Sequence, residues 1–248
     1  MSFEMISVKK ISRTQSIWID FIRGISAQLV LLGHLLAFSG IQSRYKLPIV
    51  QNFGVLVFFV LSGYLITQTT LLKGRGYGFS GYLIDRFARI FFSFLPALIL
   101  VSVFDFLFIE DLNSKYNNST FNWVANLFMI QALPFHSLLN IEAYGSARVF
   151  WTVSVEWWFY LFFGINFFKG LKRREFYWPI LPIFSVSSFF VLFYFGFRGN
   201  GLSVYWMIGL GLSILWNSSN TQLVISKKNG QLICGSIFLI LLVRTYIN

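Results

Sequence analysis

Apolar segments long enough to cross a membrane recur along the whole chain, and they restrict its fold more than any other feature. Of 248 residues, 56% are hydrophobic and only 12% are charged, whereas charged residues make up about 25% of soluble domains. A helix crosses the hydrocarbon core with about 20 apolar residues. The sequence predicts such spans at 17–40, 52–72, 90–109, 150–168, 177–197, 201–217 and 231–247. We expect an all-α, polytopic transmembrane helical bundle of about seven or eight spans, forming a single domain over residues 1–248.

Basic residues predict the orientation of these spans. The net charge is +11, and Lys and Arg concentrate at the cytoplasmic ends of membrane helices, so the charge does not indicate a nucleic-acid partner. Lys9, Lys10 and Arg13 predict a cytoplasmic N-terminus in the cell (inner or plasma) membrane. The shorter apolar piece 121–135 is interpreted as interfacial or re-entrant, because this keeps the basic cluster at 169–174 inside.

Three ionisable residues occur in the first predicted span: Asp20, Arg23 and His34. At 100° per residue, Arg23 and Asp20 fall within about 20° and 40° of His34, on either side of it. Ionisable groups inside a membrane are costly and usually mark a functional site. Asp20 and Arg23, three residues apart, can also pair. The simpler interpretation is an interfacial ion pair and a histidine bonded to a neighbouring helix.

Further polar groups stand beside later spans. The sequence Lys73-Gly74-Arg75-Gly76-Tyr77-Gly78-Phe79-Ser80-Gly81 is interpreted as part of a flexible loop over 73–89, since no strand or P-loop context accompanies its glycines. Arg86 and Arg89 suit phosphate binding, or they supply ordinary cytoplasmic charge. Glu156 lies about two turns inside its span, where it orients His34, handles protons or pairs with a structural arginine. His136 falls in a predicted outer loop, and with one cysteine (Cys234) and two histidines the chain offers no Cys/His metal cluster.

Four motifs occur in a specific order. They are Ile19-Asp20-Phe21-Ile22-Arg23-Gly24-Ile25 with His34 eleven residues after the arginine; Gly54 followed by Phe58-Phe59-Val60-Leu61-Ser62-Gly63-Tyr64-Leu65-Ile66; Arg86-x-x-Arg89-Ile90 before Pro96; and Trp151-Thr152-Val153-Ser154-Val155-Glu156 before Phe159-Tyr160. Together they resemble the membrane-bound acyltransferase-3 family. Leu56 and Trp157 stand where members often have polar residues. Members commonly have about ten spans, and the last span here ends at Asn248, so we expect a chain shortened at its C-terminus.

The resemblance implies a membrane O-acyltransferase that moves an acetyl (acyl) group from cytoplasmic acetyl-CoA to a hydroxyl of a cell-surface polysaccharide or glycoside. His34 would be the essential base, with Asp20 and Glu156 as further catalytic positions. Arg86, Arg89 and Arg23 would serve the acyl-CoA donor, and no metal is implied. The expected partners are acyl-CoA, the glycan acceptor and membrane lipids. Two alternatives remain open: a transporter or flippase using the same polar stripe, and an inactive, truncated relative.

Overall fold

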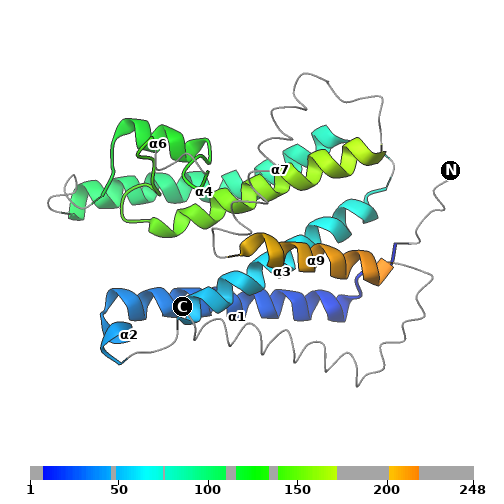
Figure 1. Ribbon diagram of the computed structural model, residues 1–248, viewed down its shortest axis with the longest axis horizontal. Coiled ribbons are helices and arrows are strands. Elements are labelled where there is room, and N and C mark those ends of the chain that lie inside the picture. The colour runs from blue at the N-terminus through cyan, green and yellow to red at the C-terminus, as the bar shows by residue number, and fades with distance from the viewer. Residues whose placement is uncertain are drawn as a thin grey trace. The chain divides into compact units, whose positions relative to one another are not determined.

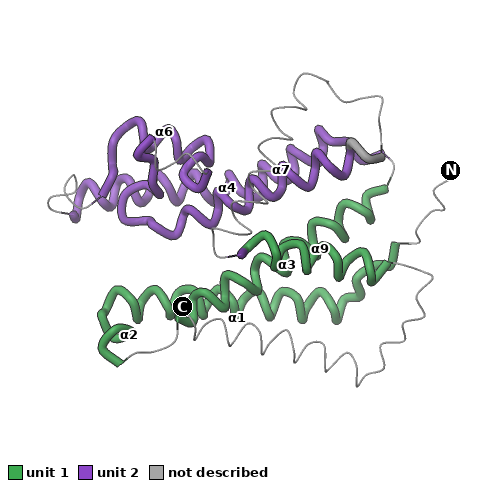
Figure 2. Tube along the Cα trace, in the orientation of Figure 1, with its two compact units in different colours: residues 1–74, 202–248 green, residues 75–201 purple. Residues whose placement is uncertain are grey.

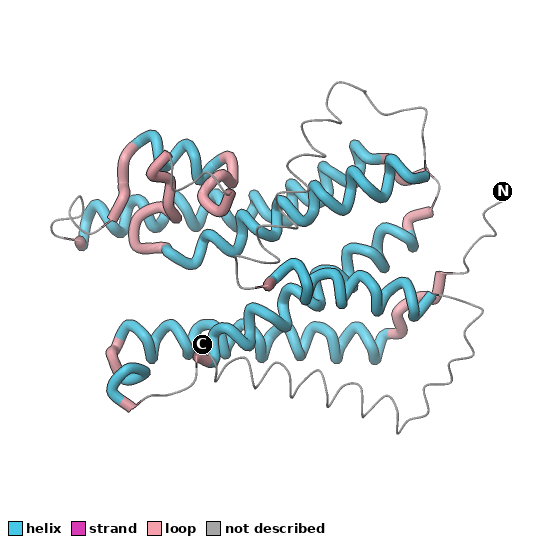
Figure 3. Tube along the Cα trace, viewed as in Figure 1, coloured by secondary structure: helices cyan, strands magenta, loops and turns pink. Residues whose placement is uncertain are grey.

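The computed structural model describes residues 8–45, 49–74, 76–109, 116–133, 139–171 and 201–217. Every regular element in these ranges is a helix, and none is a strand, which confirms the all-α class (Figures 1 and 3). The elements are α1 (Arg13–Phe38), α2 (Ile41–Arg44), α3 (Val50–Leu72), α4 (Phe79–Phe108), α6 (Thr120–Leu127), the 3-10 turn η1 (Arg148–Phe150), α7 (Trp151–Leu171) and α9 (Leu202–Asn217).

Three helices of the described ranges, α1, α3 and α4, are long and apolar enough to cross a membrane. They have 26, 23 and 30 residues, or about 39, 35 and 45 Å at 1.5 Å per residue. The predicted spans 150–168 and 201–217 form α7 and α9, but α7 is not among the three and α9 has only 16 residues. The predicted spans 177–197 and 231–247 lie outside the described residues. Seven or eight crossings therefore stay a prediction.

The start of α4 corrects one expectation. The sequence favours a flexible loop over 73–89 and a span that begins at 90, whereas the helix begins at Phe79 after Gly78, eleven residues earlier. A buried face with a spacing of four runs through the supposed loop. Its members are Tyr82, Arg86, Ile90, Phe94 and Leu98. Such a face packs along a helix, and the charged Arg86 within it had concealed the pattern. Arg86 and Arg89 are therefore helical residues.

The piece 121–135 does not form a transmembrane helix in its described part. It contains α6, whose eight residues rise only about 12 Å, less than half of the hydrocarbon thickness. Ser119 caps the helix by accepting a hydrogen bond from the Asn122 backbone N–H at 3.2 Å. The chain then leaves the helix at Met129, whose φ is +58°. This break in the helix agrees with the prediction that 121–135 does not cross the membrane.

The described elements divide between two compact units, residues 1–74 with 202–248 and residues 75–201 (Figure 2). A single domain over 1–248 stays a prediction. In the first unit, α3 packs against both α1 and α9, and glycines let the helices approach closely. A Cβ on Gly54 would lie 2.6 Å from the Ser26 carbonyl oxygen of α1, and one on Gly209 would lie 2.9 Å from the Tyr64 backbone nitrogen of α3.

A buried amide network closes one end of the first unit. Gln68 of α3 is fully buried, and its side-chain oxygen accepts hydrogen bonds from the Asn217 amide at 2.6 Å and the Ser213 hydroxyl at 3.1 Å. Its side-chain nitrogen donates to the Lys9 carbonyl at 2.5 Å, while the Lys9 backbone N–H donates to Asn217 Oδ1 at 2.9 Å. The network thus fastens the segment before α1 to α3 and α9.

The second unit is built on the pairing of α4 with α7. Phe94 of α4 meets Phe150 edge to face at 5.2 Å, and Phe91 meets Trp157 in the same way at 5.4 Å. Near the start of α4, Tyr82 lies against Gly164 of α7, where a Cβ would come within 2.9 Å of the ring carbon Cδ1. Gly164 therefore makes room for a tyrosine that also takes part in the candidate site.

Candidate functional site

The first unit carries three of the predicted site residues on α1. Arg23 Nη1 lies 3.6 Å from Asp20 Oδ1, which is the pair that their spacing predicts. The Asp20 side chain is 67% exposed and that of Arg23 is 39% exposed within the chain. Exposed pairs contribute only about 0–1 kcal/mol to stability in water. The fold therefore does not need these two charges, which leaves them available to a ligand or to lipid headgroups.

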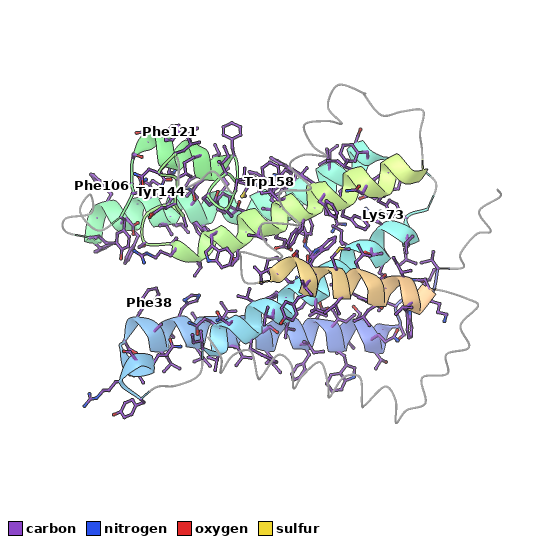
Figure 4. The ribbon with its side chains drawn as sticks, in the orientation of Figure 1. Phe38, Lys73, Phe106, Phe121, Tyr144 and Trp158 are labelled. Atoms are coloured by element: carbon purple, nitrogen blue, oxygen red, sulfur yellow. The ribbon has the colours of Figure 1, made fainter. Side chains whose placement is uncertain are left out.

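His34 lies eleven residues after Arg23, about 16 Å further along α1. It is half-buried, and its ring stacks on Phe38 with centroids 6.0 Å apart. Phe38 ends α1 beside α2 (Figure 4). Among the described residues, no hydrogen bond to the imidazole is formed, so its nitrogens are available for chemistry.

The backbone of α3 comes close to α1 immediately beside His34. A Cβ on Gly33 would lie 2.6 Å from the Gln51 backbone nitrogen. The side-chain oxygen of Gln51 is buried and accepts no hydrogen bond from the described residues. The neighbourhood of His34 therefore combines a close contact between α1 and α3 with the Gln51 side-chain oxygen, which has no hydrogen-bond donor among the described residues.

The second unit places Arg86 between two tyrosines. The guanidinium carbon lies 5.5 Å from the ring centroid of Tyr82 and 5.7 Å from that of Tyr160, both within cation–π range. The Tyr82 hydroxyl donates to the Tyr160 carbonyl at 2.8 Å, and the Tyr160 hydroxyl donates to the Glu156 carboxylate. We call Tyr82, Arg86, Glu156 and Tyr160 the tyrosine cage. It links two of the predicted site residues, Arg86 and Glu156, through Tyr160.

The two predicted phosphate-binding arginines have different surroundings. Arg86 is 6% exposed, because it faces α7 from within the buried stripe of α4. Arg89 is exposed. Three residues separate them by about 4.5 Å along the axis and about 60° around it. The sequence motif treats them as equivalent, and the packing of α4 on α7 distinguishes them.

The six predicted residues thus divide equally between the two units. Asp20, Arg23 and His34 belong to the first unit, and Arg86, Arg89 and Glu156 belong to the second. Within the units, the structure pairs Asp20 with Arg23 and links Arg86 to Glu156. Their assembly into one site stays a prediction. His136 and Cys234 lie outside the described residues.

Sequence reasoning missed Asp105, a fully buried carboxylate near the end of α4. Its two oxygens accept hydrogen bonds from the Ser146 backbone N–H at 2.7 Å and the Ser146 hydroxyl at 2.6 Å. Asp105 follows Arg86 by 19 residues on one helix, which is about 28 Å at 1.5 Å per residue. That separation is close to the thickness of the hydrocarbon core. Arg86 and Asp105 therefore mark the two ends of a membrane-length stretch of α4. The sequence feature that could have identified Asp105 is a single acidic residue within an apolar run.

Ser146 ends an irregular stretch, residues 140–146, that side chains hold in place; we call it the pinned segment. Asn122 and Asn126 of α6 are fully buried. The Glu142 backbone N–H donates to Asn122 Oδ1 at 3.0 Å, and its carbonyl accepts from the Asn126 amide at 2.7 Å. The Tyr144 backbone N–H donates to Asn126 Oδ1 at 3.1 Å. Figure 4 shows Tyr144 in the loop beside α6.

Comparison with known proteins identifies the class and then the family. The all-helical fold, with membrane-length helices that carry His34 and Arg86, defines an integral membrane protein with ionisable groups in or beside its spans. A family model described as an acyltransferase domain matches residues 16–246, and the chain belongs to this acyltransferase-3 family. The resemblance carried by the four motifs is thereby confirmed.

A curated relative gives a more specific likeness. The chain is 27% identical over 173 residues to a protein of Shigella phage Sf6 named O-acetyl transferase. The match covers 68% of this chain and 51% of that protein, so the chain spans about half the length of the relative it matches. No solved structure matches the chain.

Proposed function

We propose that this chain acts as a membrane O-acyltransferase that transfers an acetyl group from cytoplasmic acetyl-CoA to a hydroxyl of a cell-surface glycan or glycoside. The observation that carries the proposal is an imidazole to which no described residue is hydrogen-bonded, inside a membrane-length helix, in a chain of the acyltransferase-3 family. The named activity of the phage relative supports acetyl as the transferred group.

In this mechanism His34 is the general base. The neutral imidazole accepts the proton of the acceptor hydroxyl while the hydroxyl oxygen attacks the thioester carbonyl carbon. An ester C–O bond forms and the C–S bond breaks. The departing thiolate takes the proton from the imidazolium and leaves as free coenzyme A, so the histidine returns to its neutral form.

The basic end of α4 binds the donor. Guanidinium groups bind phosphate oxygens through paired hydrogen bonds, and both arginines lie near the end of α4 from which the apolar stretch begins. Asp20, Arg23 and Glu156 orient polar groups and balance charge. Positive charge at this end raises the local concentration of an anionic donor. The same charge distribution supports a cytoplasmic N-terminus.

The test of the base is His34→Ala in cells that make surface glycans. The variant is expected to reach the membrane at normal levels and to lose ester-linked acetyl groups, measured by mass spectrometry of the purified glycan. Gln28→Ala is the matched control, because Gln28 is an exposed polar residue of the same helix. Full acetylation by His34→Ala would overturn the mechanism.

A second measurement separates chemistry from transport. Purified protein in vesicles is expected to release free coenzyme A from acetyl-CoA when a glycoside acceptor is present. Proton or anion flux without thioester cleavage would instead assign the polar residues of α1 to transport. Absence of both activities would identify the chain as an inactive relative.

A further inference from the structure

The packing of α4 separates the two arginines of the Arg-x-x-Arg motif. We propose that Arg89 alone reads the phosphates of the acyl donor, whereas Arg86 joins α4 to α7 as the centre of the tyrosine cage. The inference rests on the proposed function, since it assigns the specificity of that function's donor end to one residue.

Arg86 is already committed to the protein interior. It is 6% exposed, and the rings of Tyr82 and Tyr160 lie within 5.5 and 5.7 Å of its guanidinium carbon. To reach a phosphate in solution, the fork would have to leave these rings. Cation–π contacts strengthen when they are shielded from water, so this displacement is unfavourable. A phosphate that entered the cage instead would be stripped of water beside the Glu156 carboxylate, to which Tyr160 is bonded.

The partners of the cage are themselves fixed. Tyr82 is fully buried, its ring lies against Gly164, and its hydroxyl is bonded to the Tyr160 carbonyl at 2.8 Å. Tyr160 is 2% exposed, and its own hydroxyl is bonded to Glu156 one turn earlier on α7. Every contact of this set connects α4 with α7 or stabilises such a connection. The arrangement is that of an interhelical tie.

Arg89 meets the opposite conditions. It is exposed, and it lies on the same end of the same helix, about 4.5 Å from the level of Arg86. No ion pair or hydrogen bond joins its fork to another described residue, so the fork is available for bidentate binding.

The experiment compares two thioesters that differ in their phosphates. Acetyl-CoA carries a pyrophosphate and a 3′-phosphate, and S-acetylpantetheine carries none. The donor ratio is kcat/KM for acetyl-CoA divided by kcat/KM for S-acetylpantetheine. Arg89→Gln is expected to lower this ratio about 10- to 100-fold by raising the KM for acetyl-CoA, the loss of one charge-assisted contact. The values for S-acetylpantetheine should be unchanged.

Variants of the cage are the matched comparison. Arg86→Gln and Tyr82→Leu are expected to lower the melting temperature and to reduce kcat/KM for both donors by the same factor, so that the ratio stays within about twofold of the wild type. If either fails to fold, Arg86→Lys and Tyr160→Phe are measured instead. Competitive inhibition by adenosine 3′,5′-bisphosphate gives a second reading, expected to weaken in Arg89→Gln only.

Two results would overturn the assignment. One is a donor ratio that collapses in Arg86→Gln or Arg86→Lys but not in Arg89→Gln. The other is an unchanged ratio in Arg89→Gln, which would show that Arg89 does not bind the donor phosphates. A wild-type protein that uses both thioesters equally well would refute phosphate recognition in the proposed function itself. That outcome is distinguishable, because it is seen before any substitution is made.

Discussion

Asp105 is predicted to hold the pinned segment, and its replacement by alanine should release that segment as a whole. Both of its oxygens accept hydrogen bonds from Ser146, at 2.6 and 2.7 Å. Hydrogen bonds to a charged group contribute about 1.5–3 kcal/mol each. Because one residue donates both bonds, we expect a combined loss of about 2–4 kcal/mol, which raises the population of the open segment about 30- to 900-fold at 1.36 kcal/mol per tenfold.

The assay is hydrogen–deuterium exchange of the protein in lipid nanodiscs, followed at the backbone amides of Glu142 and Tyr144. The hydrogen-bond acceptors of these amides are Asn122 and Asn126, not Asp105. Their exchange accelerates in Asp105→Ala only if the segment opens cooperatively. Glu142→Gln is the control, because it changes an exposed acid of the same segment. Exchange within about threefold of the wild type at both amides would refute the reasoning.

Three further predictions test the first unit and the turn that meets Asp105. Gly209→Ala should lower the melting temperature, because the added Cβ would clash with the α3 backbone. The control Gly211→Ala has open space around the added Cβ, so it should leave stability unchanged or raise it by about 0.5–1 kcal/mol through helix propensity. Equal effects of the two substitutions on the melting temperature would contradict the close packing of α3 on α9. Gln68→Ala should free the Lys9 backbone, so trypsin should cleave after Lys9 and Lys10 about tenfold faster, a factor that corresponds to the loss of one or two hydrogen bonds. The control Gln28→Ala, at an exposed residue, should not change the cleavage rate. Gly145→Ala should reproduce the exchange pattern of Asp105→Ala, because φ is +58° there and the added Cβ would meet the Asp105 carboxylate; normal exchange in this variant would show that the turn accommodates a side chain.

The helical class and the positions of the long helices could be predicted from the sequence, because membrane-length apolar runs leave few alternatives. The runs at 17–40 and 52–72 correspond closely to α1 and α3. The start of α4 could not be predicted, since Arg86 interrupts its apolar face and only the packing on α7 reveals that the arginine belongs to that face.

The functional roles of the candidate site residues stay predictions, and only the contact between near neighbours in the chain could be predicted from the sequence. The spacing of Asp20 and Arg23 gives their ion pair directly, because the partners are neighbours on one helix. The cage around Arg86 combines residues 78 positions apart in the chain, Tyr82 and Tyr160, and no local pattern connects them. Asp105 was overlooked because its partner Ser146 is 41 residues away.

The amide network around Gln68 also bears on how the chain is made. Residues 202–217 supply the partners of an amide in α3, so the two are separated by the whole second unit in the order of synthesis. Until the ribosome has produced Asn217, the side-chain oxygen of Gln68 lacks its partners in α9, and Gly63 of α3 lacks the helix that it contacts. The first unit can therefore complete its packing around Gln68 only after residue 217 has been made, and a chain that stops before residue 202 lacks the α9 partners of Gln68.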